Sequence, residues 1–539
     1  MNKTFYTFEK SRNGETVPLI NLPDGKTQVV HSLIDPKREA QRLISTITEE
    51  TGFIIFLGLG GGFYPEAALE LTNARVIVID FNKNGIEELL KSKDYSKLLE
   101  NSRFNLLVDP SFEEIKNFII EQYKPALHDG IKTIPLRTRV DYDKDLFEKT
   151  AEIIQEAIEI VSGDYSAQAF FGIRWFSNII RNVKNIDLVK NQEKNSILLS
   201  SSPEEAAIVA AGPSLDQQLP LLKKAKEKGV FIICCDTALG VLLHNGIEPD
   251  IIVSIDCQFI SYYHFIGCDF NNKQRGIPLL LDIASPPLLF GLSQSPVFFS
   301  SAHPLALYIS GNFKSLMRLD TSGANVTYTC LSLAKLMGIN NITLYGADFS
   351  YVGSRSYARG TYINPYFSKK QNRLSPLEAQ MSVFLYRSPF LLSENGKNKN
   401  YYETHSLRFY RKKLEEKASI MITMKQNTKI TCAPGQGAPI NIQRIINNAR
   451  YTEIEKKEQI INKKYSNGRD FLEQYKKDIA IMPAVQNQSS FTEKEKLIYT
   501  TLLPLAAAIK KRNIKLKQNE LMEEVKNFSI SKIEKILNC

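Results

Sequence analysis

The sequence predicts an α/β protein with a Rossmann-like N-terminal unit, a doubly wound central domain and an all-helical C-terminal domain. Apolar runs of strand length alternate with stretches of helical periodicity over most of the chain. Two of these runs, 53–57 and 206–210, lead into glycine-containing turns, as strands of such sheets do before a helix. Beyond residue 441 only helix-spaced apolar residues remain.

Length and composition indicate a soluble protein of several domains. A chain of 539 residues is too long for a single core, and 43% hydrophobic with 23% charged residues is ordinary for globular proteins. Many of the lysines behind the net charge of +10 follow Tyr451, which favours a solvated helical surface over a nucleic-acid groove. The N-terminus has no apolar signal core, and Asp282 interrupts the apolar window 279–291. We therefore expect no membrane span and a cytoplasmic location.

The seven cysteines are odd in number, scattered, and without the spacing of a metal site. This pattern predicts buried free thiols in a reducing compartment. They are Cys234, Cys235, Cys257, Cys268, Cys330, Cys432 and Cys539.

Residues 1–140 have the pattern of a first α/β unit. The apolar strand 53–57 is followed by the glycine run 58–62, and a second strand, 75–79, ends at Asp80 roughly twenty residues later. This is the spacing of a dinucleotide or S-adenosylmethionine site, in which the acid binds ribose hydroxyls. A purely structural use of the glycines, for packing a helix against the strand, is the favoured interpretation, because no recognisable catalytic group follows.

Residues 141–204 predict a helical connector. Apolar residues recur with helical spacing between Ile153 and Ile179, and Trp175 lies in an aromatic stripe that we assign to the core. The polar, serine-rich segment 191–205 predicts a linker into the next domain.

The central region, 205–440, alternates strands and helices. Three of its strands end in an acid-containing cluster, which places Asp236, Asp256 and Asp348 at the carboxyl edge of a parallel sheet. That edge is where ligands bind in doubly wound folds. The predicted strands are 207–210, 230–234, 251–255, 279–281, 297–299 and 342–345.

The turn Gly212-Pro213-Ser214 follows the first of these strands. Ser214 is in position to cap the next helix, whose first amides have no internal partner and therefore attract anions. Gly212 would let a phosphate approach the backbone. An ordinary strand-to-helix turn is the alternative interpretation.

Five short motifs occur in this order in the central region: Ala211-Gly212-Pro213-Ser214-Leu215-Asp216, Cys235-Asp236-Thr237-Ala238, Pro249-Asp250-Ile251 with Asp256, Thr321-Ser322-Gly323 and Tyr345-Gly346-Ala347-Asp348-Phe349. They resemble the motility-associated-factor family of flagellin glycosyltransferases, whose central domain is similar to archaeal 6-hydroxymethylpterin diphosphokinases. Their order also resembles sialyltransferases that use CMP-activated sialic acid, so the resemblance implies a sialyltransferase-like central domain.

The resemblance implies a donor pocket. In it Gly212, Pro213 and Ser214 would cradle the CMP phosphate or ribose, and Asp236 would occupy a sugar-contacting position. The segment Thr321-Ser322-Gly323 would meet the cytidine or the sugar carboxylate. The pair Tyr351 and Tyr357 would bind the leaving phosphate. Asp256 and Asp348 are the other donor-binding residues that the resemblance implies.

Two departures from the sialyltransferase pattern bear on the donor. Ala211 and Asp236 both replace an asparagine. The resemblance therefore implies a related nonulosonic acid, pseudaminic or legionaminic, transferred from its CMP donor to Ser or Thr of flagellin. Asp250 and Asp256 are six residues apart and do not form the Asp-x-Asp metal pair of other glycosyltransferases. We therefore expect no obligatory metal or cofactor.

Transfer to a hydroxyl needs a proton acceptor, and histidine is the side chain whose ordinary pKa lies nearest neutrality. His405 is our candidate, because the resembling sialyltransferases take their catalytic histidine from a lid after the tyrosine pair. A solvated histidine at the start of a helix, 407–416, is the alternative, and His264 and His303 remain open. The other histidines are His31 and His128, in the first unit, and His244, which ends a helix.

The C-terminal region, 441–539, predicts amphipathic, lysine-rich helices that cap the sheet or hold the protein acceptor. The function predicted for the whole chain is O-glycosylation of flagellin in support of flagellar assembly and motility. The alternatives are a pterin diphosphokinase, which would need ATP, magnesium and clustered carboxylates, and a non-catalytic flagellin-binding protein.

Overall fold

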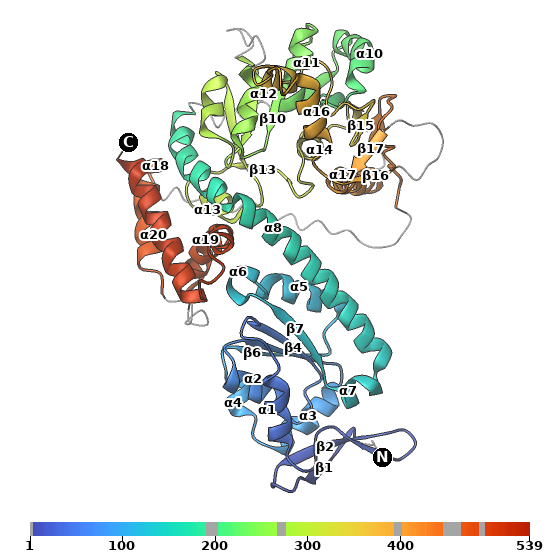
Figure 1. Ribbon diagram of the computed structural model, residues 1–539, viewed down its shortest axis with the longest axis vertical. Coiled ribbons are helices and arrows are strands. Elements are labelled where there is room, and N and C mark those ends of the chain that lie inside the picture. The colour runs from blue at the N-terminus through green and yellow to red at the C-terminus, as the bar shows by residue number, and fades with distance from the viewer. Residues whose placement is uncertain are drawn as a thin grey trace. The chain divides into compact units, whose positions relative to one another are not determined.

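The computed structural model describes residues 4–189, 203–266, 276–392, 401–425, 427–445, 465–483 and 491–538 (Figure 1). Its contacts divide the chain into two units. Unit 1 comprises Met1–Ile173, Met482–Lys496 and Leu503–Phe528. Unit 2 comprises Arg174–Ile481, Leu497–Leu502 and Ser529–Cys539. The predicted domain boundaries at 140, 204 and 440 stay predictions.

Three long helices contribute residues to both units. Helix α8 (Lys144–Leu188) crosses from unit 1 to unit 2 within a single element. In the C-terminal region, α19 (Glu493–Arg512) and α20 (Gln518–Leu537) are each divided between the units. The helical character expected of both regions is confirmed. The predicted linker 191–205 lies mostly outside the described residues.

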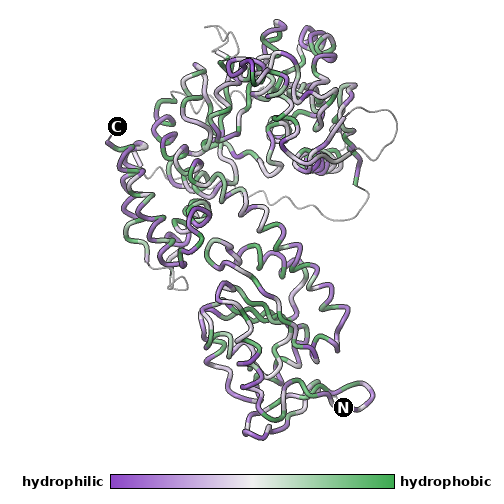
Figure 2. The backbone as a smooth tube through the Cα atoms, viewed as in Figure 1, coloured by the Kyte–Doolittle hydropathy of each residue, from purple (hydrophilic) through white to green (hydrophobic). Residues whose placement is uncertain are grey.

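Unit 1 is built on a parallel sheet of four strands in the order β6-β5-β4-β7. Every residue of β4 is buried, because helices cover both faces of a parallel sheet. Figure 2 shows the hydrophobic residues of unit 1 concentrated on these strands. The strands are β4 (Phe53–Leu57), β5 (Arg75–Asp80), β6 (Phe104–Val108) and β7 (Ile131–Pro135). An antiparallel sheet precedes them, with β1 (Tyr6–Lys10), β2 (Thr16–Asn21) and β3 (Thr27–Val29).

Three helices of unit 1, α1, α3 and α5, begin at residues whose side chains accept from an amide of the first turn. Ser111 and Glu114 form a reciprocal capping box, and Asp35 and Asn82 accept from the third amide of their helices. The helices are α1 (Pro36–Ile44), α2 (Phe63–Leu71), α3 (Lys83–Ser92), α4 (Ser96–Leu99), α5 (Phe112–Gln122), α6 (Pro125–His128) and α7 (Arg137–Tyr142).

Unit 2 contains an eight-stranded parallel sheet in the order β13-β12-β11-β10-β9-β8-β14-β18. The six predicted strands are present within one or two residues, and β13 and β18 were not predicted. The strands are β8 (Glu205–Val209), β9 (Phe231–Cys235), β10 (Ile251–Ser254), β11 (Leu279–Asp282), β12 (Pro296–Ser300), β13 (Met317–Arg318), β14 (Asn341–Tyr345) and β18 (Lys429–Cys432).

The strand order reverses between β8 and β14. The chain runs outward from β8 to β13 on one side, and then crosses through α14 (Val326–Leu336) to pair β14 with the other side of β8. Helix α14 covers β8, β9 and β10, and its apolar side chains share one core with the strands. Such a reversal opens a crevice at the carboxyl edge of the sheet. Helix α10 (Leu215–Glu227) begins at this point.

The remaining described elements of unit 2 are a small sheet and several helices. A small antiparallel sheet has the order β15-β17-β16, with Tyr351 opposite Tyr402. Its strands are β15 (Tyr351–Val352), β16 (Phe390–Leu392) and β17 (Tyr401–Thr404). The helices are η2 (Asp236–Ala238), α11 (Leu239–His244), η3 (Phe259–Tyr262), α12 (Tyr263–Ile266), η5 (Pro287–Leu292), α13 (Pro304–Asn312), α15 (Ile363–Ser368), α16 (Leu377–Leu385), α17 (His405–Met424) and α18 (Gly468–Ala480).

Two further sequence expectations can be compared with the described residues. Five cysteines are free thiols, but only four of them are buried; Cys432 is exposed, because β18 is the edge strand of the sheet. Cys268 and Cys539 lie outside the described residues. Among the described helices, none has both the length and the apolar composition that a bilayer crossing requires.

Candidate active site

The Gly212-Pro213-Ser214 turn is locked to the end of β14. The Gly212 amide donates to the Gly346 carbonyl at 2.8 Å, and the Ser214 amide donates to Oδ2 of Asp348 at 2.7 Å. A Cβ atom on Gly212 would lie 2.4 Å from the Gly346 oxygen and 2.5 Å from Asp348 Oδ2. Glycine is therefore required at 212 by contacts within the protein.

Ser214 does not cap α10, contrary to the sequence prediction. Its hydroxyl makes no bond to that helix and instead accepts the Gln436 amide at 2.9 Å, and the residue is only 3% exposed. Pro213 is buried beside it. The Asp348 carboxylate takes the place that a ligand anion would have on the Ser214 amide. Burial raises the pKa of Asp348, and the bonds from Ser214 oppose that rise.

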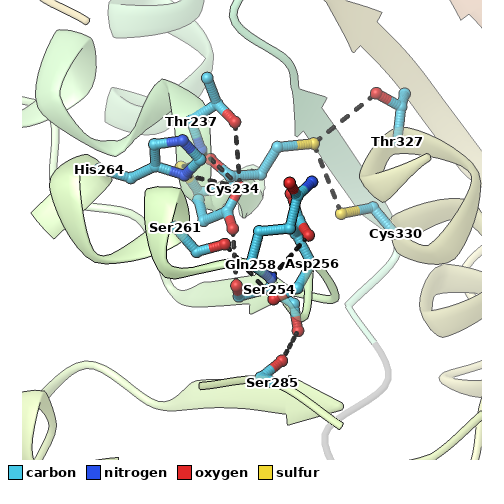
Figure 3. A network of polar contacts seen from close by, with 12 residues as sticks. Cys234, Thr237, Ser254, Asp256, Gln258, Ser261, His264, Ser285, Thr327 and Cys330 are labelled. Atoms are coloured by element: carbon cyan, nitrogen blue, oxygen red, sulfur yellow. Dashed lines mark hydrogen bonds and ion pairs between the residues drawn. The ribbon is translucent and has the colours of Figure 1, made fainter. Parts of the chain in front are cut away.

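A second group of polar side chains lies where β9 and β10 end (Figure 3). Asp236 is 1% exposed. Its Oδ2 accepts the Ser254 hydroxyl at 2.6 Å, and its Oδ1 accepts the amide and hydroxyl of Thr237 at 2.7 and 3.0 Å. Because both carboxylate oxygens are taken up inside the protein, Asp236 is not placed for direct contact with a sugar.

His264, on α12, faces this carboxylate. Its Nδ1 lies 3.4 Å from Asp236 Oδ1, and its side chain is 7% exposed. Burial alone would raise the pKa of Asp236, but His264, Ser254 and Thr237 together hold it below its usual value. The buried carboxylate is therefore the ionised partner of the imidazole.

Asp256 lies in the loop after β10 and is half-buried. Burial raises the pKa of its carboxyl, and repulsion from Asp236 adds to the rise, while the Gln258 amide, 2.9 Å from Oδ1, opposes it. Two carboxyl groups near each other, one with a lowered and one with a raised pKa, are typical of sites that move protons.

Tyrosines surround these acids. Burial raises the pKa of Tyr357 to about 12, and the charges of Tyr351, Asp236 and Asp256 add to that rise. Arg387 opposes the rise at Tyr357 and also lowers the pKa of Tyr351, which burial raises. The ring of Tyr362 stands 4.7 Å from His264 and 6.1 Å from Tyr357 between centroids. The predicted pair Tyr351 and Tyr357 thus lies at the same edge as the acids.

The Thr321-Ser322-Gly323 segment joins β13 to α14. The Ser322 hydroxyl lies 3.1 Å from the Tyr328 hydroxyl, which donates to Asp320 at 2.7 Å. A Cβ atom on Gly323 would lie 2.2 Å from the Tyr328 ring, and Thr321 is half-buried. The helix that follows reaches the acid cluster, since Thr327 Oγ1 lies 3.7 Å from the thiol of Cys235, the residue before Asp236 (Figure 3).

The histidines differ in their surroundings. His405 is exposed at the start of α17, where Thr404 caps the helix by accepting the Leu407 amide. Tyr410, whose pKa the charge of Asp256 helps to raise, is five residues further, about 140° around the helix from His405. His303 caps α13 through Nδ1, and burial lowers its pKa to about 3. Of the three central histidines considered, His264 is the one within the acid cluster.

Sequence reasoning did not single out Tyr362, Tyr410 or Arg387, and it ranked His264 below His405. The available signal was the aromatic density of 357–366 and the Tyr262-Tyr263-His264 run. Neither pattern shows by itself that two distant segments meet.

Among the described residues, no group of three His, Cys, Asp or Glu side chains is arranged to hold a metal ion.

The glycine run of unit 1 is occupied by the protein's own side chains. The Leu59 amide donates to Asp80 at 3.0 Å, and the Gly61 amide donates to Nε2 of His31 at 2.9 Å. Asp80 also forms a fully buried ion pair with Arg139 at 3.0 Å. The acid expected to bind a ribose is thus engaged with Arg139 and the loop amide.

Comparison with known proteins agrees with this architecture. The family model described as "6-hydroxymethylpterin diphosphokinase MptE-like" matches residues 177–354. Two uncharacterized proteins of Treponema pallidum are similar, one 33% identical over 181 residues and one 26% identical over 198 residues. These matches cover 31% and 36% of the chain, and 62% and 92% of the two relatives. The chain therefore spans less than two thirds of the first of them.

The chain is an α/β protein in which residues 177–354 are similar to the MptE-like family. More particularly, the chain has the fold of the Maf glycosyltransferase from Magnetospirillum magneticum AMB-1, with a TM-score of 0.57 at 13% identity. The match covers 100% of this chain and 91% of that protein. The fold implied by the resemblance is thereby confirmed.

Proposed function

We propose that the protein is a glycosyltransferase that moves a sugar from a nucleotide-activated donor to a protein hydroxyl. The observation that carries the proposal is the cluster of Asp236, Asp256, His264 and Tyr357 at the carboxyl edge of the sheet, in a chain with the fold of a Maf glycosyltransferase. This edge is where a doubly wound sheet binds its ligand.

The chemistry of the cluster suits a phosphate leaving group. With a pKa of about 12, the Tyr357 hydroxyl keeps its proton at neutral pH and can donate it in a hydrogen bond to an anionic oxygen. Donors that are already oriented stabilise the charge that develops as a phosphate departs. Arg387, whose charge acts on Tyr351 and Tyr357, adds a cation on the same side.

The donor we propose is a CMP-activated nonulosonic acid of the pseudaminic or legionaminic type, and the acceptor is Ser or Thr of flagellin in the cytoplasm. The test is intact-mass measurement of flagellin coexpressed with this chain, with and without a pathway that makes the donor. We expect a mass increase of one or more sugar residues only when the chain and the pathway are both present. Unmodified flagellin in their joint presence would overturn the proposal.

Tyr357→Phe gives a sharper version of the same test, with Tyr142→Phe in unit 1 as its matched control. Removing the Tyr357 hydroxyl should lower transfer by two orders of magnitude or so, since one lost transition-state donor costs about that much. Tyr142→Phe should transfer normally. Equal transfer by both variants would remove Tyr357 from the site.

A pterin diphosphokinase is the alternative, because the family model that matches 177–354 carries that description, but the Maf glycosyltransferase fold of the whole chain does not favour it. Its test is direct: incubation with 6-hydroxymethylpterin, ATP and magnesium, followed by chromatography. Formation of the pterin diphosphate would establish this activity. A non-catalytic flagellin-binding protein would instead retain its effect on motility in the Tyr357→Phe variant.

A further inference from the structure

We propose that His264, oriented by Asp236, accepts the proton of the acceptor hydroxyl during transfer. The inference rests on the glycosyltransferase function proposed above. It assigns the base to a buried Asp–His pair at the sheet edge, whereas the sequence pointed to His405.

Asp236 is held from three directions. Ser254 from β10 donates to Oδ2 at 2.6 Å, Thr237 donates to Oδ1 through its amide at 2.7 Å, and the His264 imidazole faces Oδ1 at 3.4 Å. A carboxylate that is 1% exposed has no freedom to turn away. Because a carboxylate only accepts hydrogen bonds, the imidazole nitrogen facing it, Nδ1, carries the proton, and Nε2 carries the lone pair.

Three other histidines, one buried and two half-buried, show what a structural histidine looks like in this chain. Nε2 of His31 accepts the Gly61 amide, and Nδ1 of His128 and of His303 accept the Lys124 and Leu305 amides. Burial lowers the pKa of each of the three to about 3, so they serve as neutral acceptors. His264 is paired with a carboxylate instead.

The position of the pair argues for function. Taking a carboxylate out of water costs several kcal/mol and adds little net stability even when the charge is paired. Here the charge lies at the end of β9, beside Asp256 and next to the Tyr357 and Tyr362 rings. Figure 3 shows His264 between Thr237 and Ser261, which belong to η2 and η3, the short helices that follow β9 and β10.

The acceptor oxygen forms a bond to the anomeric carbon of the sugar as its O–H bond breaks, and the proton passes to Nε2 of His264. The bond from the anomeric carbon to the phosphate oxygen breaks, and its electron pair leaves with CMP. Asp236 stabilises the imidazolium that results, and Tyr357 donates to the departing phosphate. Asp236 is a positioning residue, because it acts through His264.

The experiment measures transfer to purified flagellin by the full-length chain, with kcat and KM for the donor determined separately and CMP affinity measured by calorimetry. His264→Asn retains a donor group near the place of Nδ1 but has no atom at Nε2. We expect kcat to fall by 10²- to 10⁴-fold, the usual range for a lost general base, while KM and CMP affinity stay within a few-fold. His244→Ala, an exposed residue on α11, is the control and should match the wild type.

Two further variants guard against a structural explanation. His264→Ala should regain part of its rate on addition of free imidazole, which a general loss of packing would not allow. Asp236→Asn should lower kcat with little change in KM, because the amide keeps the shape but no longer holds the Nδ1–H tautomer.

The outcomes separate the two proposals. Transfer by wild type with an undiminished kcat in His264→Asn overturns the inference alone. The same conclusion follows if His405→Ala abolishes transfer while His264→Asn remains active. Absence of transfer by the wild type overturns the glycosyltransferase proposal itself, and the inference falls with it.

Discussion

The glycine turn after β4 in unit 1 and the glycine turn after β8 in unit 2 have the same construction. In each, a loop amide donates to a carboxylate at the end of a neighbouring strand: Leu59 to Asp80 at 3.0 Å, and Ser214 to Asp348 at 2.7 Å. In each, a Cβ atom on a glycine would collide with the protein's own atoms. Both turns have sequences typical of ligand-binding loops, but these loop amides donate to carboxylates of the protein itself.

The two edges differ in what else they carry. At the edge of unit 1, burial raises the pKa of Asp80, the ion pair with Arg139 opposes that rise, and both side chains are fully buried. At the edge of unit 2, Asp256, Asp282 and Asp348 all have a pKa raised by burial, and an imidazole and several tyrosines lie beside Asp236. The two edges therefore differ in the partners of their carboxylates: an arginine faces Asp80 in unit 1, whereas an imidazole and tyrosines lie beside Asp236 in unit 2.

The largest effect on stability is expected from removing the charge of Arg139, which pairs with Asp80 at the edge of unit 1. Arg139→Met would leave Asp80 as an unpaired buried charge and should lower local stability by about 3–5 kcal/mol. Amide hydrogen exchange of β4 and β5 measures this change, since it reports each region of a two-unit protein separately.

The double variant Asp80→Asn with Arg139→Met is the control. Replacing both charges by groups of similar shape should restore most of the protection. It should also modify flagellin normally if Asp80 has only a structural role. Loss of modification by a well-folded double variant would show that unit 1 binds a ligand that transfer requires.

The next-largest effect on stability concerns Asp282, a buried carboxyl group in unit 2. Burial raises the pKa of Asp282 to about 6 from an ordinary value of 3.8, although the Ala284 amide and Ser301 oppose the rise. The folded state then holds its proton more tightly than the unfolded chain, so this contribution is fully favourable below pH 4 and is lost as the pH rises to 6. The gap corresponds to about 3 kcal/mol.

Asp282→Asn removes this dependence and keeps an oxygen for the Ala284 amide. We expect the variant to gain stability over wild type progressively between pH 4 and pH 6, and to keep a constant advantage above that range. The measurement is urea unfolding at several pH values, monitored through hydrogen exchange of the β11 amides. It shows whether the variant is more or less stable than wild type at each pH. A variant less stable than wild type at pH 7 would contradict this expectation.

These residues show how much the sequence could predict. The six strands and the clustering of Asp236, Asp256 and Asp348 at one edge followed from apolar runs and from the rule that parallel strands end together. The Asp236–His264 and Asp80–Arg139 pairs did not, because each joins segments that no local pattern relates. The edge strands β13 and β18 were missed because β13 has only two residues and β18 buries only Ile430, so neither forms an apolar run.

A third effect tests the reason for glycine in the unit 2 turn. Gly212→Ala places a methyl group 2.4 Å from the Gly346 oxygen and should destabilise unit 2 by about 1–3 kcal/mol, the usual cost of overpacking. Gly163→Ala is the matched control, because that glycine lies exposed within α8 with nothing within 4 Å of its Cβ position. The control should gain about 0.5–1 kcal/mol from helix propensity. Equal, small effects at both positions would mean that the space at 212 is open to a ligand.

The smallest effect decides whether Ser214 serves the protein or the donor. Its hydroxyl accepts the Gln436 amide at 2.9 Å, but Gln436 is exposed, so water can replace the lost acceptor. Ser214→Ala should therefore cost about 0.5–1 kcal/mol of stability. Because the hydroxyl is buried and already bonded, we expect CMP affinity measured by calorimetry to stay unchanged. Were the donor phosphate to displace Gln436 and bind this hydroxyl, affinity would fall about tenfold, as one lost hydrogen bond of about 1.4 kcal/mol requires. That result would mean that the Gly212-Pro213-Ser214 turn binds the donor phosphate, as its sequence predicts. The glycine turns of the two units would then differ in function.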